Sequence, residues 1–288
     1  MNYIFTSEEC WKYECFAHPE APFRVKDSYQ HLRNKKDILN FEFVYINDEI
    51  DEEILLWTHT KSLIEQVKNN SFYDADTPNL PNIFHYAKIS ANIVLHSMKS
   101  VLNNNKSFAL TRPPGHHATS SQLGGFCYFN NIAVAINWYL KNFEDKKVAI
   151  LDIDVHHGNG TEEIFLGNKR VLFISLHQMH IYPGSGLKSR QNCINFPLFA
   201  QTEDKEYLKV LNSAIEKIKE FNPDILGVSC GFDTYKNDPL AGLSLSENCY
   251  YEIGKAIKEI NLPTFCVLEG GYSKQLPVLI EKFLSGFF

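Results

Sequence analysis

The sequence of 288 residues predicts a single α/β domain, 1–288, in which a parallel sheet is covered by helices on both faces. Segments with strand character alternate with segments of helical periodicity along the chain. Several of the strand segments are apolar throughout, as strands buried on both faces of a parallel sheet are. No internal repeat or low-complexity linker divides the sequence, so one domain is expected.

Short apolar runs bounded by turn residues indicate the strands. These are Tyr3–Phe5, Phe41–Ile46, Ser107–Leu110, Val148–Ile153, Val171–Leu176, Ile225–Cys230 and Thr264–Leu268. Apolar residues that recur every three or four positions indicate the helices. These are Asp27–Leu39, one or two short helices within Asp51–Val67, then Phe84–Leu102, Asn131–Leu140, a helix near Thr161, Asp204–Phe221 and Glu247–Ile260. Prolines mark two loops, His18–Val25 and Ser71–Asn82.

Unusual polar clusters follow the ends of five predicted strands. In chain order they are HH after Ser107–Leu110, DIDVHH after Val148, SLHQ after Val171, GFD after Ile225 and EGGY after Thr264. Ligands of open α/β sheets bind where the carboxyl ends of parallel strands meet. The five loops are therefore expected to share one rim.

Composition and charge exclude several classes of function. Apolar residues make up 44% of the chain and charged residues 22%, which is ordinary for a soluble globular protein. The net charge of -6 and the lack of a basic run argue against direct binding of nucleic acid. Seven cysteines without a CxxC pair are typical of reduced thiols, so a cytoplasmic location is expected. No signal peptide, lipidation motif or apolar run of about 20 residues suggests a membrane partner.

The stretch KVAILDIDVHHGNG supplies half of a predicted metal site. Side chains alternate in an extended chain, so Asp152, Asp154 and His156 share one side, and a cation would satisfy them. A catalytic zinc keeps three protein ligands, and we choose Asp233 as the third to join Asp154 and His156. The alternative is that Asp233 caps the turn that follows it. His157 points to the opposite face and is expected to pack in the core.

His116 and His117 form a second cluster in a loop framed by proline and glycine. Either imidazole could take a proton from a metal-bound water, because histidine titrates near neutral pH. For either histidine alone, simple hydrogen bonding in a surface loop would be the favoured interpretation. Gly270 and Gly271 would let Tyr272 sit on a tight turn and donate a hydrogen bond to an oxyanion. Taken by itself, such a tyrosine is more often a packing residue.

These motifs lie in the order found in a known family. They are HPEAPFR (18–24), RPPGHHA (112–118), GGFCYFNN (124–131), DIDVHHGNGT (152–161), GFD with DPLAG (231–242) and LEGGY (268–272). Together they resemble the zinc-dependent histone deacetylase family over almost the whole chain. Asn159, where nuclear class I members carry Asp, makes the chain similar to class II and to bacterial histone deacetylase-like amidohydrolases.

The resemblance implies the arginase/deacetylase fold, an α/β domain with about eight parallel strands. It implies one zinc ion per chain, held by Asp154, His156 and Asp233. It also implies a structural potassium ion close to the zinc, at Asp152 and Ser175 together with main-chain oxygens.

The implied activity is hydrolysis, by metal-activated water, of acetyl or other acyl groups on the side-chain amine of lysine in proteins or peptides, with sensitivity to hydroxamates. His117 would be the general base and later the proton donor, and His116 its electrostatic partner. Tyr272 would polarise the carbonyl and hold the oxyanion. Asp152 would orient His116, and Asn159 would tune His117 less strongly than a carboxylate.

An acyl-lysine tunnel is also implied. Gly125 and Phe126 would form one wall, and Tyr182, where the family usually has Phe, would form the other. Leu240 would sit at the rim, where polyamine-specific relatives carry a glutamate, which disfavours acetylpolyamines. Asp74, in the long polar loop, would grip backbone amides of the substrate.

Two other functions are less consistent with the sequence. An arginase-like ureohydrolase needs two manganese ions, but Gly158 and Tyr235 stand where that family supplies Asp. A non-catalytic acetyl-lysine binding module would be favoured by loss of a ligand or of the tyrosine, and all are present. Deacetylation of acetylpolyamines or other small acylated amines remains the alternative activity. The expected partner is thus an acylated lysine protein, peptide or small amine, and a homo-oligomer stays open.

Overall fold

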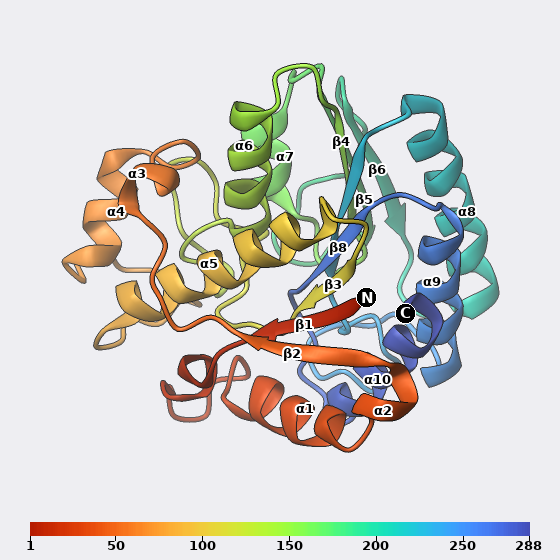
Figure 1. The fold of residues 1–288 in the computed structure, drawn as a ribbon, viewed down its shortest axis with the longest axis horizontal. Helices are drawn as coiled ribbons and strands as arrows, with labels where there is room; N and C mark the ends of the chain where they lie inside the picture. Colours follow the sequence, from red (N-terminus) through yellow and green to blue (C-terminus); the bar gives the residue numbers. More distant parts are fainter.

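Eight parallel strands form one sheet in the computed structural model, which describes residues 1–288, in the order β2-β1-β3-β8-β7-β4-β5-β6 (Figure 1). The strands are β1 (Asn2–Thr6), β2 (Phe41–Tyr45), β3 (Lys106–Ala109), β4 (Val148–Asp152), β5 (Val171–Gln178), β6 (Cys193–Leu198), β7 (Ile225–Cys230) and β8 (Thr264–Leu268). Every residue of β4, β5, β7 and β8 is buried. This confirms the predicted α/β class, because the strands are parallel and the central ones are buried on both faces.

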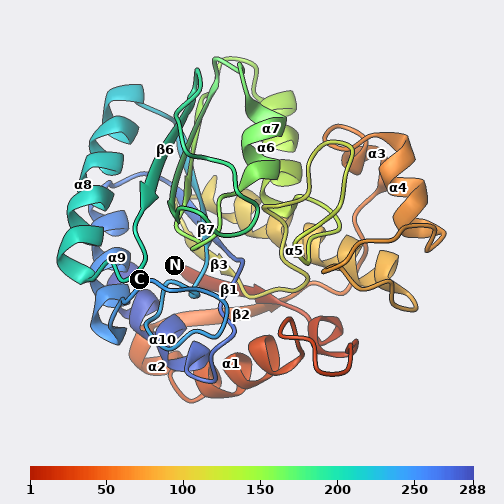
Figure 2. The ribbon, with the colours of Figure 1, turned by 180° about the vertical axis from the view of Figure 1, so that it is seen from behind.

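Two helical layers cover the sheet (Figures 1 and 2). One layer contains α3 (Glu52–Leu55), α4 (Lys61–Lys68), α5 (Ile83–Val101), α6 (Asn131–Asn142) and α7 (Asn159–Phe165). The other contains α1 (Phe23–Arg33), α2 (Lys36–Leu39), α8 (Asp204–Phe221), α9 (Glu247–Glu259) and α10 (Leu276–Phe287). A short 3-10 helix, η1 (Glu8–Trp11), follows β1. No helix combines the length and the apolar character that crossing a membrane requires.

Several elements differ from the sequence-based expectation. β6, α10 and η1 were not predicted, α1 begins at Phe23 instead of Asp27, and the single helix predicted over Asp27–Leu39 is divided into α1 and α2. β6 is an edge strand that contains Pro197 and is only partly buried, so it lacks the continuous apolar run of the central strands. The helix start moves to Phe23 because Pro22 already has helical backbone angles, and proline favours the beginning of a helix.

The carboxyl ends of five neighbouring strands open onto one edge of the sheet. The loops that follow β3, β4, β5, β7 and β8 cover residues 110–130, 153–158, 179–192, 231–246 and 269–275. A single cluster of 74 buried hydrophobic residues supports the sheet beneath them. The fold thus gathers at this edge the five polar clusters that the sequence places between residues 110 and 275.

Candidate active site

Three candidate metal ligands meet where β4 and β7 end. Asp154 and His156 follow β4, and Asp233 follows β7, the strand paired with β4. His156 Nδ1 lies 3.1 Å from Asp154 Oδ1 and 3.2 Å from Asp233 Oδ2. Both carboxylates are fully buried. The fold therefore brings together the three side chains that were predicted as ligands, with one donor atom of each within 4.8 Å of the others.

The donor atoms fit a divalent cation. Asp233 Oδ1 accepts a hydrogen bond from the Val155 amide at 2.9 Å, but the buried Oδ2 has no hydrogen-bond partner. Burial, followed by the charge of Asp154, raises the pKa of Asp233 to about 7. Ligands at zinc distances in a tetrahedral site lie about 3.3 Å from one another, close to the observed separations. A bound cation would thus satisfy the free oxygen and remove the repulsion between the carboxylates.

A glycine lets the backbone approach this site closely. The Gly270 amide donates to Asp154 Oδ2 at 2.7 Å. A Cβ atom at Gly270 would overlap Asp233 Oδ2, and no larger residue would leave both carboxylates in place. The LEGGY motif after β8 is therefore part of the support of the metal ligands.

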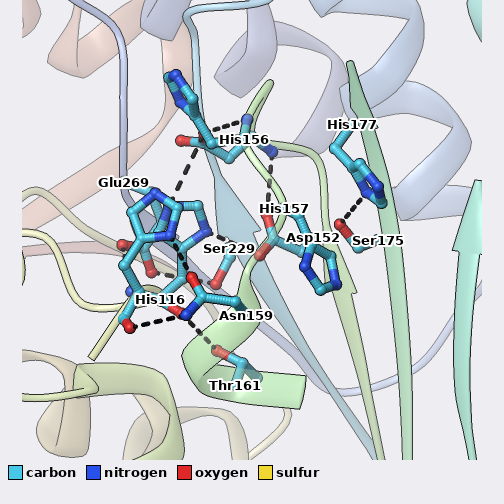
Figure 3. A network of polar contacts seen from close by, with 12 residues as sticks. His116, Asp152, His156, His157, Asn159, Thr161, Ser175, His177, Ser229 and Glu269 are labelled. Atoms are coloured by element: carbon cyan, nitrogen blue, oxygen red, sulfur yellow. Dashed lines mark hydrogen bonds and ion pairs between the residues drawn. The ribbon is translucent and has the colours of Figure 1, made fainter. Parts of the chain in front are cut away.

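The two adjacent histidines have different partners. His116 Nδ1 lies 2.9 Å from Asp152 Oδ2 (Figure 3), and His117 Nδ1 lies 2.8 Å from Asn159 Oδ1. Burial opposes a charge on His116, but the carboxylates of Asp152 and Asp154 outweigh it and raise the pKa of His116 to about 10. His117 has an amide partner instead, and burial together with the charge of His116 holds its pKa well below the ordinary value. One imidazole is therefore suited to carry a charge and the other to accept a proton.

Tyr272 is fixed by its backbone and by its ring. Its amide donates to Asp238 Oδ2 at 2.7 Å. The Arg24 guanidinium lies 4.7 Å from the ring centroid, and Arg24 Nε donates to the Gly271 carbonyl at 2.7 Å. The Phe126 ring packs edge-on at 5.7 Å. These contacts hold Tyr272 at the edge of a pocket, where the residue is only 9% exposed. The residue type by itself did not predict this position.

The pocket beside these groups has a volume of about 210 Å³. It is lined by Asp76, His117, Gly125, Phe126, His156, Tyr182, Leu240 and Tyr272. The Tyr182 ring stands at 88° to the His117 ring, with 4.9 Å between centroids. Asp74 is not among the lining residues, and its Oδ1 accepts the amides of Asp76 and Thr77 at 3.0 and 2.7 Å. Asp76, in the same turn, is one of the lining residues.

Asp152 and Ser175, the expected potassium ligands, face each other across β4 and β5. Ser175 Oγ lies 2.9 Å from His177 Nδ1, and His177 Nε2 lies 3.1 Å from the Gly186 carbonyl. A carbonyl can only accept, so Nε2 carries the hydrogen. Burial and the nearby His157 lower the pKa of His177 to about 3, so Nδ1 of the neutral ring accepts the Ser175 hydrogen. The lone pairs of Ser175 Oγ remain free, which fits a cation ligand.

Glu269 is a buried residue of the site that sequence reasoning missed. Its Oε2 accepts the amides of Gly115 and His116 at 2.7 and 3.2 Å, and its Oε1 accepts the Ser229 hydroxyl at 3.1 Å. Burial raises the pKa of Glu269 to about 7. Glu269 thus holds the loop of the histidine pair. The signal for it was a carboxylate placed directly after a predicted strand of mostly apolar residues.

A second group that sequence reasoning missed is a buried cluster of one carboxylate and two arginines. Glu20 lies between two buried guanidiniums, with Arg112 Nε at 2.6 Å and Arg24 Nη1 at 3.2 Å from its Oε1. Burial works against the charge of Glu20, but Arg112 and Arg24 lower its pKa. Glu20 belongs to HPEAPFR and Arg112 to RPPGHHA, so the motifs contained both residues without indicating that they pair.

Comparison with known proteins agrees with this geometry. Residues 18–285 match the histone deacetylase domain model. The chain belongs to the histone deacetylase family. It is 36% identical to a probable deacetylase of Archaeoglobus fulgidus over 94% of this chain and 81% of that protein. It is 37% identical to acetylpolyamine amidohydrolase 2 of Pseudomonas aeruginosa over 75% of this chain and 66% of that protein.

The crystal structure of the HDA15 HD domain superposes on this histone deacetylase family member with a TM-score of 0.92 and 28% identity, covering 99% of this chain and 87% of that one. The family and the eight-stranded fold predicted from the motifs are thereby confirmed. Membership indicates an enzyme that acts on amide bonds.

Proposed function

We propose that the protein is a zinc-dependent amidohydrolase that removes acetyl groups from lysine side chains of peptides or proteins. One observation carries the proposal: the candidate ligand His156, the proton-accepting His117 and the phenol of Tyr272 line the same pocket. A metal, a base and an oxyanion donor are the groups that hydrolysis of an unactivated amide requires. We assign the zinc to Asp154, His156 and Asp233.

The pocket walls suit the substrate stem. Phe126 and Tyr182 are aromatic, and the four-carbon stem of an acylated lysine is apolar and uncharged. A volume of about 210 Å³ admits a single narrow chain and its acyl group. Leu240, which is 37% exposed, adds an apolar contact at the rim.

The hydrogen bond of His117 leaves one ring nitrogen free to accept a proton. The Asn159 amide oxygen accepts from Nδ1 at 2.8 Å, so Nε2 keeps its lone pair. When bound, zinc would polarise the acyl carbonyl and make water more acidic. His117 would take a proton from the attacking water and return it to the nitrogen as the carbon–nitrogen bond breaks, giving a carboxylic acid and a free amine. The His116 charge and the Tyr272 hydroxyl would stabilise the negative charge that develops on the carbonyl oxygen.

The test is release of acid from a panel of acylated amines by the zinc-loaded protein. The panel contains acetyl-lysine peptides, lysine peptides with longer acyl groups and N-acetylated polyamines. We expect acetate from acetyl-lysine peptides, and inhibition by a simple hydroxamate. No release from any member of the panel would refute the enzymatic proposal.

A second candidate substrate class is the small acylated amine. Two observations favour it: the similarity to acetylpolyamine amidohydrolase 2, and the acidic residue Asp76 in the pocket lining, whose negative charge would attract the distant ammonium group of such an amine. Leu240 offers no such charge. If this class is the true substrate, kcat/KM will be higher for an N-acetylated diamine than for the peptide, and Asp76→Asn will lower only the diamine value. If the peptide is the substrate, the order of kcat/KM will be reversed.

A further inference from the structure

The second histidine of HHGNG has no place in the proposed chemistry, yet it is almost completely buried. His157 is 2% exposed and points away from the metal ligands (Figure 3). Its Nε2 lies 3.0 Å from Glu162 Oε2 on α7, and its Nδ1 lies 2.8 Å from Ser185 Oγ. Ser185 belongs to the exposed loop 179–192. His157 thus ties this loop to the helix that follows the metal ligands.

A second buried histidine holds the next residue of the same loop. His177 at the end of β5 donates from Nε2 to the Gly186 carbonyl at 3.1 Å. The rings of His157 and His177 lie 4.7 Å apart. Gly186 has a φ of +77°, and a Cβ there would lie 2.6 Å from atoms of both rings. We call His157 and His177 the two-histidine clamp, because they hold the adjacent residues Ser185 and Gly186.

Glu162 extends the attachment to the far end of the loop. Its Oε2 also accepts from Asn195 Nδ2 at 2.7 Å, and Asn195 Nδ2 donates to the Lys188 carbonyl at 3.1 Å. The same short helix carries Asn159, which orients His117. One helix therefore positions a histidine of the active site and one wall of the pocket.

The loop carries Tyr182, which faces the pocket. Tyr182 is 44% exposed, its hydroxyl makes no hydrogen bond, and its ring packs against His117 at 4.9 Å. Its place is therefore set by the backbone of the loop more than by contacts of its own. We propose that the two-histidine clamp positions Tyr182 as a pocket wall and so sets how tightly the substrate stem is held. The clamp is a feature of the fold, whereas its effect on the substrate rests on the proposed function.

Ser185→Ala tests the clamp with little risk to folding, because Ser185 is exposed. Hydrogen exchange of the amides at 181–186 should accelerate about three- to tenfold, as expected for the loss of one hydrogen bond. Ser185→Thr keeps the hydroxyl and should restore the slow exchange. Lys188→Ala, in the same loop, removes a side chain that makes no hydrogen bond or ion pair, and it should leave the exchange at 181–186 unchanged. Unchanged exchange in Ser185→Ala would overturn the clamp, whether or not the protein has activity.

Kinetics test whether the clamp acts through Tyr182. Ser185→Ala should raise KM for the acetyl-lysine peptide about three- to tenfold with kcat within about twofold, because only binding of the stem is weakened. In a Tyr182→Ala background the same change should have no further effect on KM. A loss of kcat with unchanged KM, or the full effect of Ser185→Ala without Tyr182, would refute the positioning role. A wild-type protein that releases nothing from the acyl panel would refute the proposed function, while the exchange result would still decide the clamp.

Discussion

The two ends of the sheet differ in the burial of their charged side chains. At the carboxyl end, Asp154 and Asp233 are completely buried, and Glu20 is 5% exposed between two arginines. At the amino end, Lys146 and Asp224 form an ion pair of 2.7 Å whose side chains are 49% and 32% exposed. The amino end also has the larger hollow, about 560 Å³ beside Lys106 and Phe287, but no metal donor set. Buried charge, and not the size of a hollow, therefore marks the functional end.

The difference has an energetic consequence. An exposed ion pair contributes about 0 to 1 kcal/mol, because water solvates its charges almost as well as the partner does. A buried charge that loses its partner destabilises the fold by about 3 to 5 kcal/mol. Changes at the carboxyl end should therefore have large effects on stability or turnover, and changes at the amino end small ones.

Glu20→Gln should give the largest effect on stability. The change leaves the charges of Arg112 and Arg24 buried without a carboxylate, which is expected to lower the free energy of unfolding by about 3 to 5 kcal/mol. Urea unfolding measures the change. Glu216→Gln is the matched control, because Glu216 pairs with Lys219 at 64% exposure and should change stability by about 0.5 kcal/mol or less. Equal stability of the two variants would contradict the contrast between buried and exposed charge.

Tyr272→Phe should remove an oxyanion donor and leave the fold intact. We expect kcat to fall about 10²- to 10³-fold, equivalent to about 3 to 4 kcal/mol, with the zinc content unchanged. Steady-state kinetics and metal analysis measure the two quantities. Tyr73→Phe, at a side chain that is 94% exposed, should leave kcat as in the wild type. Turnover of Tyr272→Phe within about twofold of the wild type would remove Tyr272 from the mechanism.

His59 should make stability depend on pH at the carboxyl end. The buried ring accepts the Asn130 amide at Nε2 and faces the Thr119 carbonyl with Nδ1. Burial lowers the pKa of His59 from 6.5 to about 4. The unfolded chain therefore binds a proton below pH 6.5 that the folded protein does not bind until about pH 4, so stability falls as pH decreases through this window.

This contribution of His59 should be about 1.4 kcal/mol per pH unit. Denaturant unfolding at several pH values, compared between wild type and His59→Gln, isolates it from other groups. The two stability curves should converge towards pH 4 and be separated by a constant amount above pH 6.5. Parallel curves across the whole range would show that the His59 pKa is not lowered by folding.

Lys146→Ala, at the amino end, should have only a small effect. Its ion pair with Asp224 is exposed, so the free energy of unfolding should change by less than about 1 kcal/mol, and by less still in high salt. Thermal unfolding at two salt concentrations measures this. A loss of stability comparable to that of Glu20→Gln would show that the two ends do not differ in this way.

The parts of the site that follow central strands could be predicted from the sequence. Asp154, His156 and Asp233 come directly after the wholly buried strands β4 and β7, so strand alternation and parallel topology already place them together. The strand β6 could not be predicted, because an edge strand with a proline lacks that pattern. The pairing of Glu20 with Arg112 spans 92 residues, so it depends on the tertiary fold and leaves no local signal.

The sequence shows which side chains the loops carry, but it does not show in which direction these side chains point. Strand alternation correctly predicted that His157 points away from the metal ligands. Its hydrogen bond to Ser185 depends on the conformation of a loop 28 residues further along the chain. Asp74, predicted to grip backbone amides of the substrate, accepts two amides of its own turn with Oδ1, and Asp76 lines the pocket; the substrate contact of Asp74 stays a prediction. Both outcomes are set by local turn geometry that the residue types allow but do not dictate.

Metal-dependent turnover tests the central claim most directly. The protein is stripped of metal, zinc is titrated back, and acetate released from an acetyl-lysine peptide is measured beside Asp154→Ala. We predict no turnover without metal, full recovery at one zinc ion per chain, and neither zinc binding nor turnover in Asp154→Ala. Undiminished turnover by the stripped protein, or by Asp154→Ala, would contradict the assignment of the buried carboxyl-end cluster as the catalytic metal site.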